Sequence, residues 1–307
     1  MIALNEILQK YNLEGYKFME LNKGFVSDKW LIFDDHNILY VLKEITNQTE
    51  QRVADILKIQ SQLECSAKII QTYNKKNYTV VDDKIYYMTE YIDNKQGDLK
   101  TKIEDLGQFL GEVHNEMKIQ KRINTKFLKI ENNQDYLIQL LDYYKKNNYQ
   151  EYFKIIKYKL NILKGINIDD INYLKLSHQI IHGDFYGDNI LFDDKNYKLI
   201  DFDQTCLFYK EYELMRGMFM MCYDDRKNAA DIINAMKLFL KGYFKQNSIN
   251  SPIDTYNLYL YIQANSLSSL KPNHYLKKEK KEFAKKRYYI LKFLYENKKE
   301  IINILGG

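Results

Sequence analysis

Residues 181–203 read IHGDFYGDNILFDDKNYKLIDFD. Asp184 stands two residues after His182, Asn189 follows five residues later, and Asp201 ends a short apolar run. Phosphoryl transfer from a nucleotide needs such a set of groups, because one carboxylate must face the attacking hydroxyl while an amide and a second carboxylate hold metal on the phosphates. Taken singly, each residue also fits a β-hairpin with surface carboxylates. Together, between two apolar strands, they fit such a hairpin poorly.

Each polar residue of this stretch has a candidate role. Asp184 is the candidate catalytic base, which would orient the acceptor alcohol and take its proton late. Asn189 and Asp201 offer hard oxygen ligands of the kind that suit Mg²⁺. His182 is expected to pack beneath the loop and hydrogen-bond backbone rather than take part in chemistry. Asp203 is a candidate for supporting metal or substrate, with a capping or structural role as the alternative.

The N-terminal part of the chain shows a strand pattern. Short strands are expected at Phe18–Leu21, Lys29–Phe33 and Ile38–Lys43, with turn signals between them. A helix with an apolar stripe is expected at Thr49–Leu63, capped by Thr49. A hairpin is expected around residues 82–84, and helices dominate from about residue 100 onward.

The two motifs His182-Gly183-Asp184-Phe185 and Ile200-Asp201-Phe202-Asp203, together with Asn189, resemble the aminoglycoside phosphotransferase and choline kinase superfamily. Gly187-Asp188 departs from the Pro-Gly that is usual there. A Pro-Asp-Asn version is similar to homoserine kinases of the same fold, and spore-coat proteins of low-GC bacteria also share it. Tyr186 stands where protein-serine kinases carry a lysine, which argues against a protein kinase.

This resemblance implies an α+β, bilobal, protein-kinase-like fold. A small antiparallel sheet would form an N-terminal lobe over residues 1–93, and residues 94–307 would form a mostly helical lobe. Mg²⁺ and ATP would bind between them, at the kind of interface where ligand sites usually lie, and GTP is not excluded as donor.

The resemblance also implies contacts to the nucleotide. Lys43 would steady the phosphates and pair with a carboxylate of the following helix, with Glu50 the first candidate and Asp55 its competitor. Gly24 and Ser27 would lie in a nucleotide-covering loop, although an ordinary hairpin turn explains them equally well. The residues expected to bind the nucleotide are Lys43, Glu50, Gly24, Ser27, Glu90, Ile92 and Leu191, of which Glu90 and Ile92 belong to a hinge that acts through its backbone.

Composition bounds the other possibilities. The chain has 307 residues and a formal net charge of +5, and no nucleic-acid motif accompanies the lysine-rich run Lys277–Lys286. This run is either a solvated helix face or an anion-attracting patch. Three widely spaced cysteines without a signal peptide indicate a cytoplasmic protein whose cysteines are small core residues. No apolar stretch is long enough to span a bilayer, and the protein is expected to be a monomer or homodimer.

The sequence therefore favours an ATP-dependent kinase that phosphorylates a hydroxyl of a small molecule. An aminoglycoside is one acceptor, although the C-terminal helices are rich in lysine where a polycation would call for carboxylates. Homoserine or another metabolite is the first alternative, and a non-catalytic pseudokinase of the spore-coat type is the second. The helices expected within residues 133–163 either help to build the acceptor site or serve as scaffold.

Overall fold

The computed structural model describes residues 2–21, 28–95, 102–118, 128–193, 196–224, 227–275 and 277–306. The chain forms two compact units. The first unit consists of Met1–Leu99, Glu112–Phe127 and Gln179–Leu207, and the second consists of Lys100–Gly111, Leu128–His178 and Phe208–Gly307. The expected division of the chain at residue 93 stays a prediction.

An antiparallel sheet is the centre of the first unit. Its strands run in the order β1-β2-β3-β6-β4, and β5 pairs with β6. Their bounds are β1 Lys17–Glu20, β2 Lys29–Phe33, β3 Ile38–Ile45, β4 Ile69–Ile70, β5 Thr79–Val81 and β6 Lys84–Glu90. The strands expected from the sequence are confirmed to within two residues at each end. Asp82 and Asp83, both with positive φ, form the two-residue turn of the predicted hairpin.

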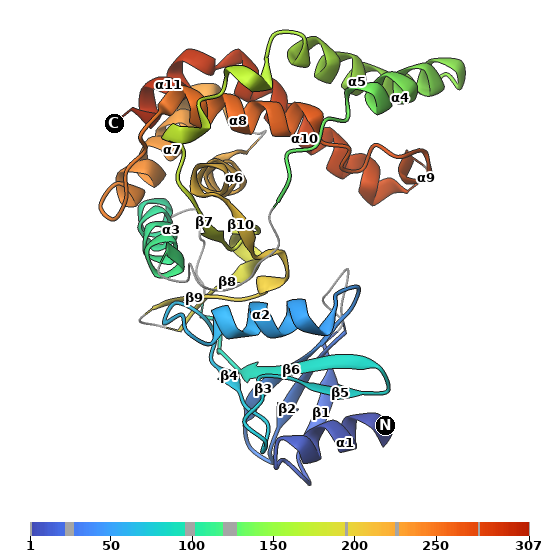
Figure 1. Ribbon diagram of the computed structural model, residues 1–307, viewed down its shortest axis with the longest axis vertical. Helices are drawn as coiled ribbons and strands as arrows, with labels where there is room; N and C mark the ends of the chain where they lie inside the picture. The colour runs from blue at the N-terminus through green and yellow to red at the C-terminus, as the bar shows by residue number, and fades with distance from the viewer. Residues whose placement is uncertain are drawn as a thin grey trace. The chain divides into compact units, whose positions relative to one another are not determined.

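The two faces of this sheet carry different helices, because side chains alternate along each strand. Leu42 and Met88 face one core cluster together with residues of α1 (Ile2–Lys10). Ile45 and Tyr87 face the opposite cluster together with Val53 and Leu57 of α2 (Glu50–Gln60). Figure 1 shows α2 lying along its face of the sheet. Lys43 therefore points to the α2 side.

The segment with the polar motif belongs mostly to the first unit. Strands β8 (Ile190–Phe192) and β9 (Tyr197–Leu199) form an antiparallel pair. The amide of Leu199 donates to the carbonyl of Cys65 at 2.7 Å, and the Leu199 carbonyl accepts from Ala67 at 3.2 Å. These bonds fix β9, and the residues that follow it, beside the chain segment between α2 and β4. Strands β7 (His178–Ile181) and β10 (Cys206–Tyr209) pair on either side of the motif.

The second unit is mostly helical. Its longer helices are α4 Gln134–Lys146, α5 Gln150–Leu163, α6 Lys210–Cys222, α7 Ala229–Tyr243, α8 Pro252–Asn265, α10 Lys278–Glu296 and α11 Lys298–Leu305. The short helix α9 spans Pro272–Tyr275. Helix α3 (Ile103–Lys118) is shared, because its residues up to Gly111 belong to this unit and the rest to the first unit. The expected insert at 133–163 is the helix pair α4 and α5, whereas the helix expected over 277–305 is divided at Asn297 into α10 and α11. The expected α+β class, with a small antiparallel sheet and a mostly helical part, is confirmed.

Close approach of α3 and α7 requires glycine. A Cβ added to Gly107 would lie 1.9 Å from the carbonyl oxygen of Phe239, and one added to Gly242 would lie 1.8 Å from the carbonyl oxygen of Glu104. Both neighbours are backbone atoms, which a side-chain rotation cannot move. The expectation that Gly107 permits close helix packing is confirmed.

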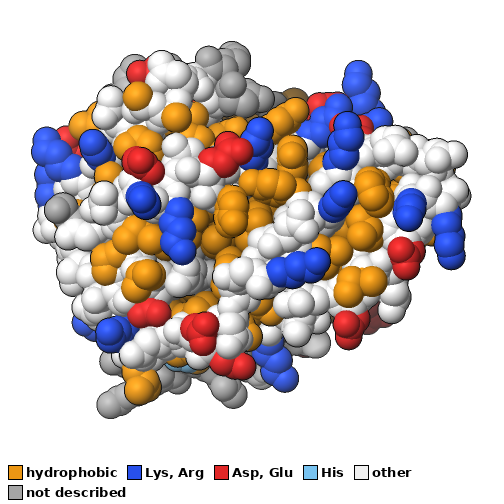
Figure 2. Space-filling model, turned by 90° about the horizontal axis from the view of Figure 1, so that it is seen from above, with side chains coloured by type: hydrophobic (Ala, Val, Ile, Leu, Met, Phe, Trp, Pro, Cys, Tyr) orange, Lys and Arg blue, Asp and Glu red, His pale blue; other side chains and the backbone are white. Residues whose placement is uncertain are grey.

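The lysine-rich run on α10 is partly used by the fold. Lys281 and Lys285 both pair with Glu151 of α5, at 3.0 and 2.9 Å. Figure 2 shows lysine and arginine side chains scattered among apolar and polar ones on the face that it displays, rather than gathered in one patch. The interpretation as a helix face with spread charges fits this arrangement better than an anion-attracting patch.

Two further expectations concern cysteines and membranes. Cys65, Cys206 and Cys222 are all buried free thiols, as expected for small core residues. Among the described residues, no helix combines the length and apolar character needed to cross a bilayer.

A buried lysine of α5, Lys159, caps the C-terminal end of helix α8. The ammonium of Lys159 donates to the carbonyls of Gln263, Ala264 and Ser266 at 2.5, 3.3 and 3.0 Å. The last carbonyls of a helix have no partner within it, and this side chain from α5 supplies one. Burial, aided by repulsion from Arg287, lowers the pKa of Lys159 to about 7.

We expect this lysine to make stability depend on pH. The unfolded chain holds the proton up to the ordinary pKa of 10.5, whereas the native chain releases it near pH 7. The native state therefore binds fewer protons in this window, and its stability should rise with pH between about 7 and 10.5. In Lys159→Met this rise should disappear, and the free energy of unfolding at pH 9 should fall by about 1–3 kcal/mol, because the carbonyls at the end of α8 lose the N–H groups of the neutral amine.

Urea denaturation at several pH values measures both effects. Lys157→Met, which changes an exposed lysine of the same helix, is the matched control and should keep the wild-type pH dependence. The same pH dependence in wild type and Lys159→Met would contradict the assignment.

Candidate active site

Backbone hydrogen bonds shape the loop that carries Asp184. Gly183 has a φ of +81°, and a Cβ there would lie 2.5 Å from the carbonyl oxygen of Gln204, so the position requires glycine. The ring of His182 is fully buried, and its Nε2 lies 3.1 Å from the carbonyl of Ile200. The amide of Asp184 donates to Nδ1 of the same ring at 3.3 Å. With Nδ1 as the acceptor, Nε2 is the ring nitrogen that donates to the Ile200 carbonyl.

The expectation that His182 packs beneath the loop is met by this geometry. Its ring also meets Phe202 edge to face at 4.7 Å between ring centroids. The histidine thus connects the start of the motif with the residues on either side of Asp201, Ile200 and Phe202. We assign it a supporting part.

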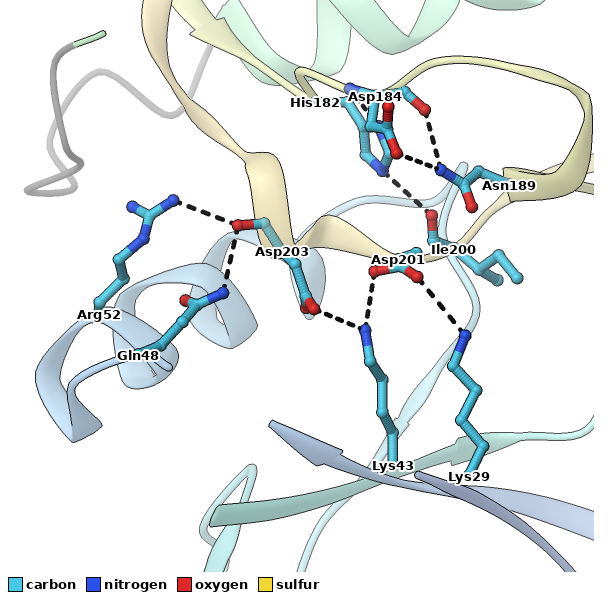
Figure 3. Close-up of polar contacts among 10 residues, drawn as sticks. All are labelled: Lys29, Lys43, Gln48, Arg52, His182, Asp184, Asn189, Ile200, Asp201 and Asp203. Carbon is cyan, nitrogen blue, oxygen red and sulfur yellow. Dashed lines mark hydrogen bonds and ion pairs between the residues drawn. The ribbon is translucent and has the colours of Figure 1, made fainter. Parts of the chain in front are cut away.

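Asp184 and Asn189 lie against each other. The amide nitrogen of Asn189 donates to the Asp184 carbonyl at 2.9 Å and to its carboxylate at 3.1 Å (Figure 3). Since the amide hydrogens have these two acceptors, the side-chain oxygen is the atom that Asn189 can offer to a cation. The backbone carbonyl of Asn189 accepts from Ile200 at 3.0 Å, which brings the residue before Asp201 alongside.

Asp201 has an unusual backbone and a charged environment. Its φ of 65° and ψ of 63° place it in the left-handed region, where a non-glycine residue is uncommon and often marks a functional site. One carboxylate oxygen accepts from Lys43 at 2.7 Å and the other from Lys29 at 3.5 Å. Burial of the carboxylate acts to raise its pKa, but the neighbouring Lys43 and Lys29 outweigh burial and lower the pKa below its ordinary value.

Lys43 is the buried cation of the site. Its side chain is 5% exposed, and its ammonium lies 2.7 Å from the Asp201 carboxylate and 2.8 Å from that of Asp203 (Figure 3). Burial alone would lower the pKa of this lysine, yet the negative groups around it, which include Asp203 and Asp201, hold it above the ordinary value. The ammonium is thus charged throughout the pH range in which proteins work.

The predicted pairing of Lys43 with Glu50, or with its competitor Asp55, is wrong. The carboxylate of Glu50 accepts from the Tyr78 hydroxyl at 2.8 Å, and that of Asp55 accepts from Gln51 at 3.2 Å. Glu50 is the first residue of α2 and its carboxylate faces Tyr78, while the buried positions of the helix are apolar except for Gln60. The carboxylates that balance Lys43 come instead from Asp201 and Asp203.

Arg52 and Gln48, which the sequence did not identify as site residues, hydrogen-bond the backbone after Asp201. Arg52 of α2 donates to the carbonyls of Asp203 and Thr205 at 3.3 and 2.8 Å, and Gln48 donates to the Asp203 carbonyl at 3.3 Å. An arginine near a helix start gives no sign in the sequence of which distant carbonyls it will meet. These bonds attach α2 to the backbone of Asp203, whose side chain holds Lys43.

Two further residues predicted to bind the nucleotide, Glu90 and Ile92, lie at and just after the end of β6. The amides of Glu90 and Tyr91 donate to the carbonyls of Lys68 and Leu39, at 2.9 and 2.8 Å. A pocket of about 200 Å³ adjoins this segment, and its lining residues are Glu90, Tyr91, Ile92, Asp93, Lys95 and Asp193. Leu191 is the central residue of β8 and is partly buried. Gly24 and Ser27 lie outside the described residues.

The donor set suits a divalent metal by its chemistry. Asp201 and Asn189 offer a carboxylate and an amide oxygen, which are hard ligands. Among the described residues, no group of three or more histidine, cysteine, aspartate or glutamate side chains is placed to hold a metal by itself. A site with one or two protein ligands that relies on substrate phosphates for the rest is typical of Mg²⁺.

The site thus brings together a buried lysine, an aspartate and an asparagine with hard oxygen atoms, and a further carboxylate on the loop after β7. The sequence profile of the phosphotransferase enzyme family, APH, matches residues 17–243. Because this match covers more than half of the 307 residues, the chain belongs to that family. The resemblance seen in the motifs is confirmed. No curated protein matches the sequence.

Several solved structures have a similar fold. A spectinomycin phosphotransferase in complex with ADP and spectinomycin matches with a TM-score of 0.64 and 14% identity, covering 96% of this chain and 97% of that chain. An amicoumacin kinase in complex with AMP-PNP, Ca²⁺ and its ligand Ami gives 0.63 and 13%, covering 90% and 87%. A choline kinase from Cryptosporidium parvum Iowa II gives 0.60 and 14%, covering 94% and 91%. At such identities the likeness shows the fold alone.

We expect Arg52 to stabilise the site segment. Arg52→Met keeps the aliphatic stem but removes the donor to the carbonyls of Asp203 and Thr205, which should lower the free energy of unfolding by about 1–2 kcal/mol. Lys58→Met, at an exposed position of the same helix, should change it far less. Urea denaturation of both variants measures the difference, and equal stability of the two would show that the carbonyl contacts contribute nothing.

Proposed function

We propose that this protein is an ATP-dependent kinase that transfers the γ-phosphoryl group to a hydroxyl of a small molecule. The observation that carries the proposal is the 3.1 Å hydrogen bond between the Asn189 amide and the Asp184 carboxylate. It joins the candidate base to one candidate metal ligand, and the Ile200–Asn189 backbone bond brings the second ligand, Asp201, beside them. Three residues with the roles that phosphoryl transfer needs are thus held together.

Asp184 is proposed to orient the acceptor. Its carboxylate would accept a hydrogen bond from the attacking hydroxyl, aim the oxygen at the γ-phosphorus and take the proton as the new bond forms. The hydrogen bonds from Asn189 to the carbonyl and the carboxylate of Asp184 restrict the rotation of this side chain. Such pre-organisation lowers the entropic cost of reaching the reactive geometry.

The donor side is proposed to use the other residues of the site. Asn189 and Asp201 would hold Mg²⁺, which when bound neutralises charge that develops on the phosphate oxygens. Lys43 would contact the phosphates, with Asp203 supporting its ammonium. At the hinge, the amides of Glu90 and Tyr91 already donate to protein carbonyls, so we place the backbone donor for the base at Ile92. ADP and AMP-PNP in the similar structures support a nucleotide donor, and GTP stays possible.

The acceptor is proposed as a small molecule with a hydroxyl group. The similar structures named above are a spectinomycin phosphotransferase, an amicoumacin kinase and a choline kinase. Their named substrates include antibiotics and a metabolite, so an aminoglycoside and a metabolite such as homoserine are both reasonable acceptors. The spore-coat type of pseudokinase is the alternative from another class, and the assembled Asp184, Asn189, Asp201 and Lys43 favour the enzyme.

A panel assay tests the proposal. Release of nucleoside diphosphate from MgATP and MgGTP is measured with aminoglycosides, other antibiotics, homoserine, choline and simple sugars as acceptors. Turnover that requires one of these acceptors would support the proposal and identify the substrate class. Absence of turnover, together with no rise in melting temperature on adding nucleotide, would support the pseudokinase.

We expect Asp184→Asn and Asp201→Ala to abolish this turnover. Loss of a general base typically costs a factor of about 10²–10⁴ in rate, and loss of Asp201 removes a charged metal ligand. Both variants should keep the wild-type circular dichroism spectrum, and Asp201→Ala should melt at a lower temperature, because Lys43 loses one of its two carboxylates and keeps Asp203. Asp188→Asn, at an exposed position of the same loop, is the control and should stay active. Full activity of either variant would refute the role of that residue.

A further inference from the structure

Two lysines stand directly opposite each other on neighbouring strands. In the antiparallel pairing of β2 with β3, Lys29 is the cross-strand partner of Lys43. Side chains in such a pair leave the sheet on the same face. Figure 3 shows both lysines rising from their strands toward Asp201. No candidate role was attached to Lys29 from the sequence.

This pairing has an electrostatic cost. Like charges that face each other across an antiparallel pair are destabilising, and the Lys43 side chain is only 5% exposed, where water screens poorly. In the structure Asp201 and Asp203 offset the repulsion, with one carboxylate of Asp201 shared between the two lysines. Two cations and two anions give a neutral cluster.

The two lysines are not equally held. Among the residues that the structure describes, Lys43 makes two short contacts to carboxylates, at 2.7 and 2.8 Å, whereas Lys29 makes a single long one at 3.5 Å. The Lys29 side chain is 20% exposed. Lys29 therefore loses less than Lys43 when its contact with a carboxylate is broken, and its side chain can move more freely toward a ligand.

A metal at Asp201 would change this balance. If one or both carboxylate oxygens of Asp201 hold Mg²⁺, as the proposed function requires, they are less available to the lysines. The ammonium groups would then need other anionic partners, because two facing cations without them repel each other at low dielectric. The oxygens of a nucleotide phosphate that arrives with the metal are such partners.

We propose that Lys29 is a second phosphate-binding cation, which exchanges its contact with Asp201 for a phosphate oxygen of the nucleotide. This inference rests on the proposed function and adds a ligand-contacting residue to it. Lys29 and Lys43 would then hold the phosphates from two adjacent strands, and Asp201 would pass from the lysines to the metal.

Isothermal titration of the whole protein tests this exchange without relying on turnover. The probes are MgATP, MgADP, AMP and adenosine, titrated into wild type and Lys29→Met. We expect Lys29→Met to weaken MgATP binding by about tenfold, the usual size for one charge-assisted contact, and to leave adenosine binding unchanged. The ligand at which the effect first appears identifies the phosphate that Lys29 contacts.

Lys17→Met is the matched control, because Lys17 lies on β1 of the same sheet and pairs with Asp35 at an exposed site. It should bind all four ligands as wild type does. Lys29→Arg keeps the positive charge and should recover most of the MgATP affinity. Circular dichroism and the melting temperature without nucleotide show whether each variant is folded.

A titration with ATP in EDTA separates direct contact from an effect through Asp201. Without metal, a lysine that touches phosphate still contributes to ATP affinity, whereas one that only positions Asp201 for the metal does not. A persistent loss in Lys29→Met supports direct contact. Equal MgATP affinity of wild type and Lys29→Met would overturn it. Failure of wild type itself to bind MgATP would instead contradict the proposed function.

Discussion

The ammonium of Lys43, held between the carboxylates of Asp201 and Asp203, is the interaction on which the site depends. A charge this deeply buried is unfavourable unless it is paired and hydrogen-bonded, and the two carboxylates satisfy it at 2.7 and 2.8 Å. It joins the sheet to a segment about half the chain away in sequence. Removing either partner would leave a buried charge uncompensated, so the sheet and the polar segment hold each other in place.

The other features of the site follow from this constraint. The Asp201 carboxylate points toward Lys43 on β3, although the chain changes direction just after β9. The left-handed backbone conformation of Asp201 allows this change of direction. Two hydrogen bonds lie beside this residue, from the His182 ring to the Ile200 carbonyl and from the Ile200 amide to the Asn189 carbonyl. Arg52 and Gln48 fix the carbonyl of Asp203 from the side of α2. The polar groups are thus ordered before any ligand arrives.

The sequence allowed part of this arrangement to be predicted. Asp184, Asn189 and Asp201 were identified because their spacing along a short segment determines their proximity, and the strands were identified from alternation and turn residues. The pairing of Lys43 with Glu50 was wrong, since a helix pattern says which face is apolar but not which distant charge the first turn meets. Lys29 was missed for a related reason. Its position opposite Lys43 depends on the register of β2 against β3, and abundant lysines give no sign of register.

The contact of Lys159 with the end of α8 has a consequence for folding during synthesis of the chain. Its carbonyl acceptors lie more than 100 residues further along the chain, and two tyrosines of the same helix pair, Tyr144 and Tyr152, bond to the carbonyls of Leu270 and Ser269. During synthesis, α4 and α5 leave the ribosome long before these acceptors exist. Until residue 270 has left the ribosome, helices α4 and α5 cannot form these hydrogen bonds. The Lys159 ammonium and the hydroxyls of Tyr144 and Tyr152 are then solvated by water. The docking of this helix pair is therefore a late event of biosynthesis, and a nascent chain stopped earlier would expose the apolar faces of both helices.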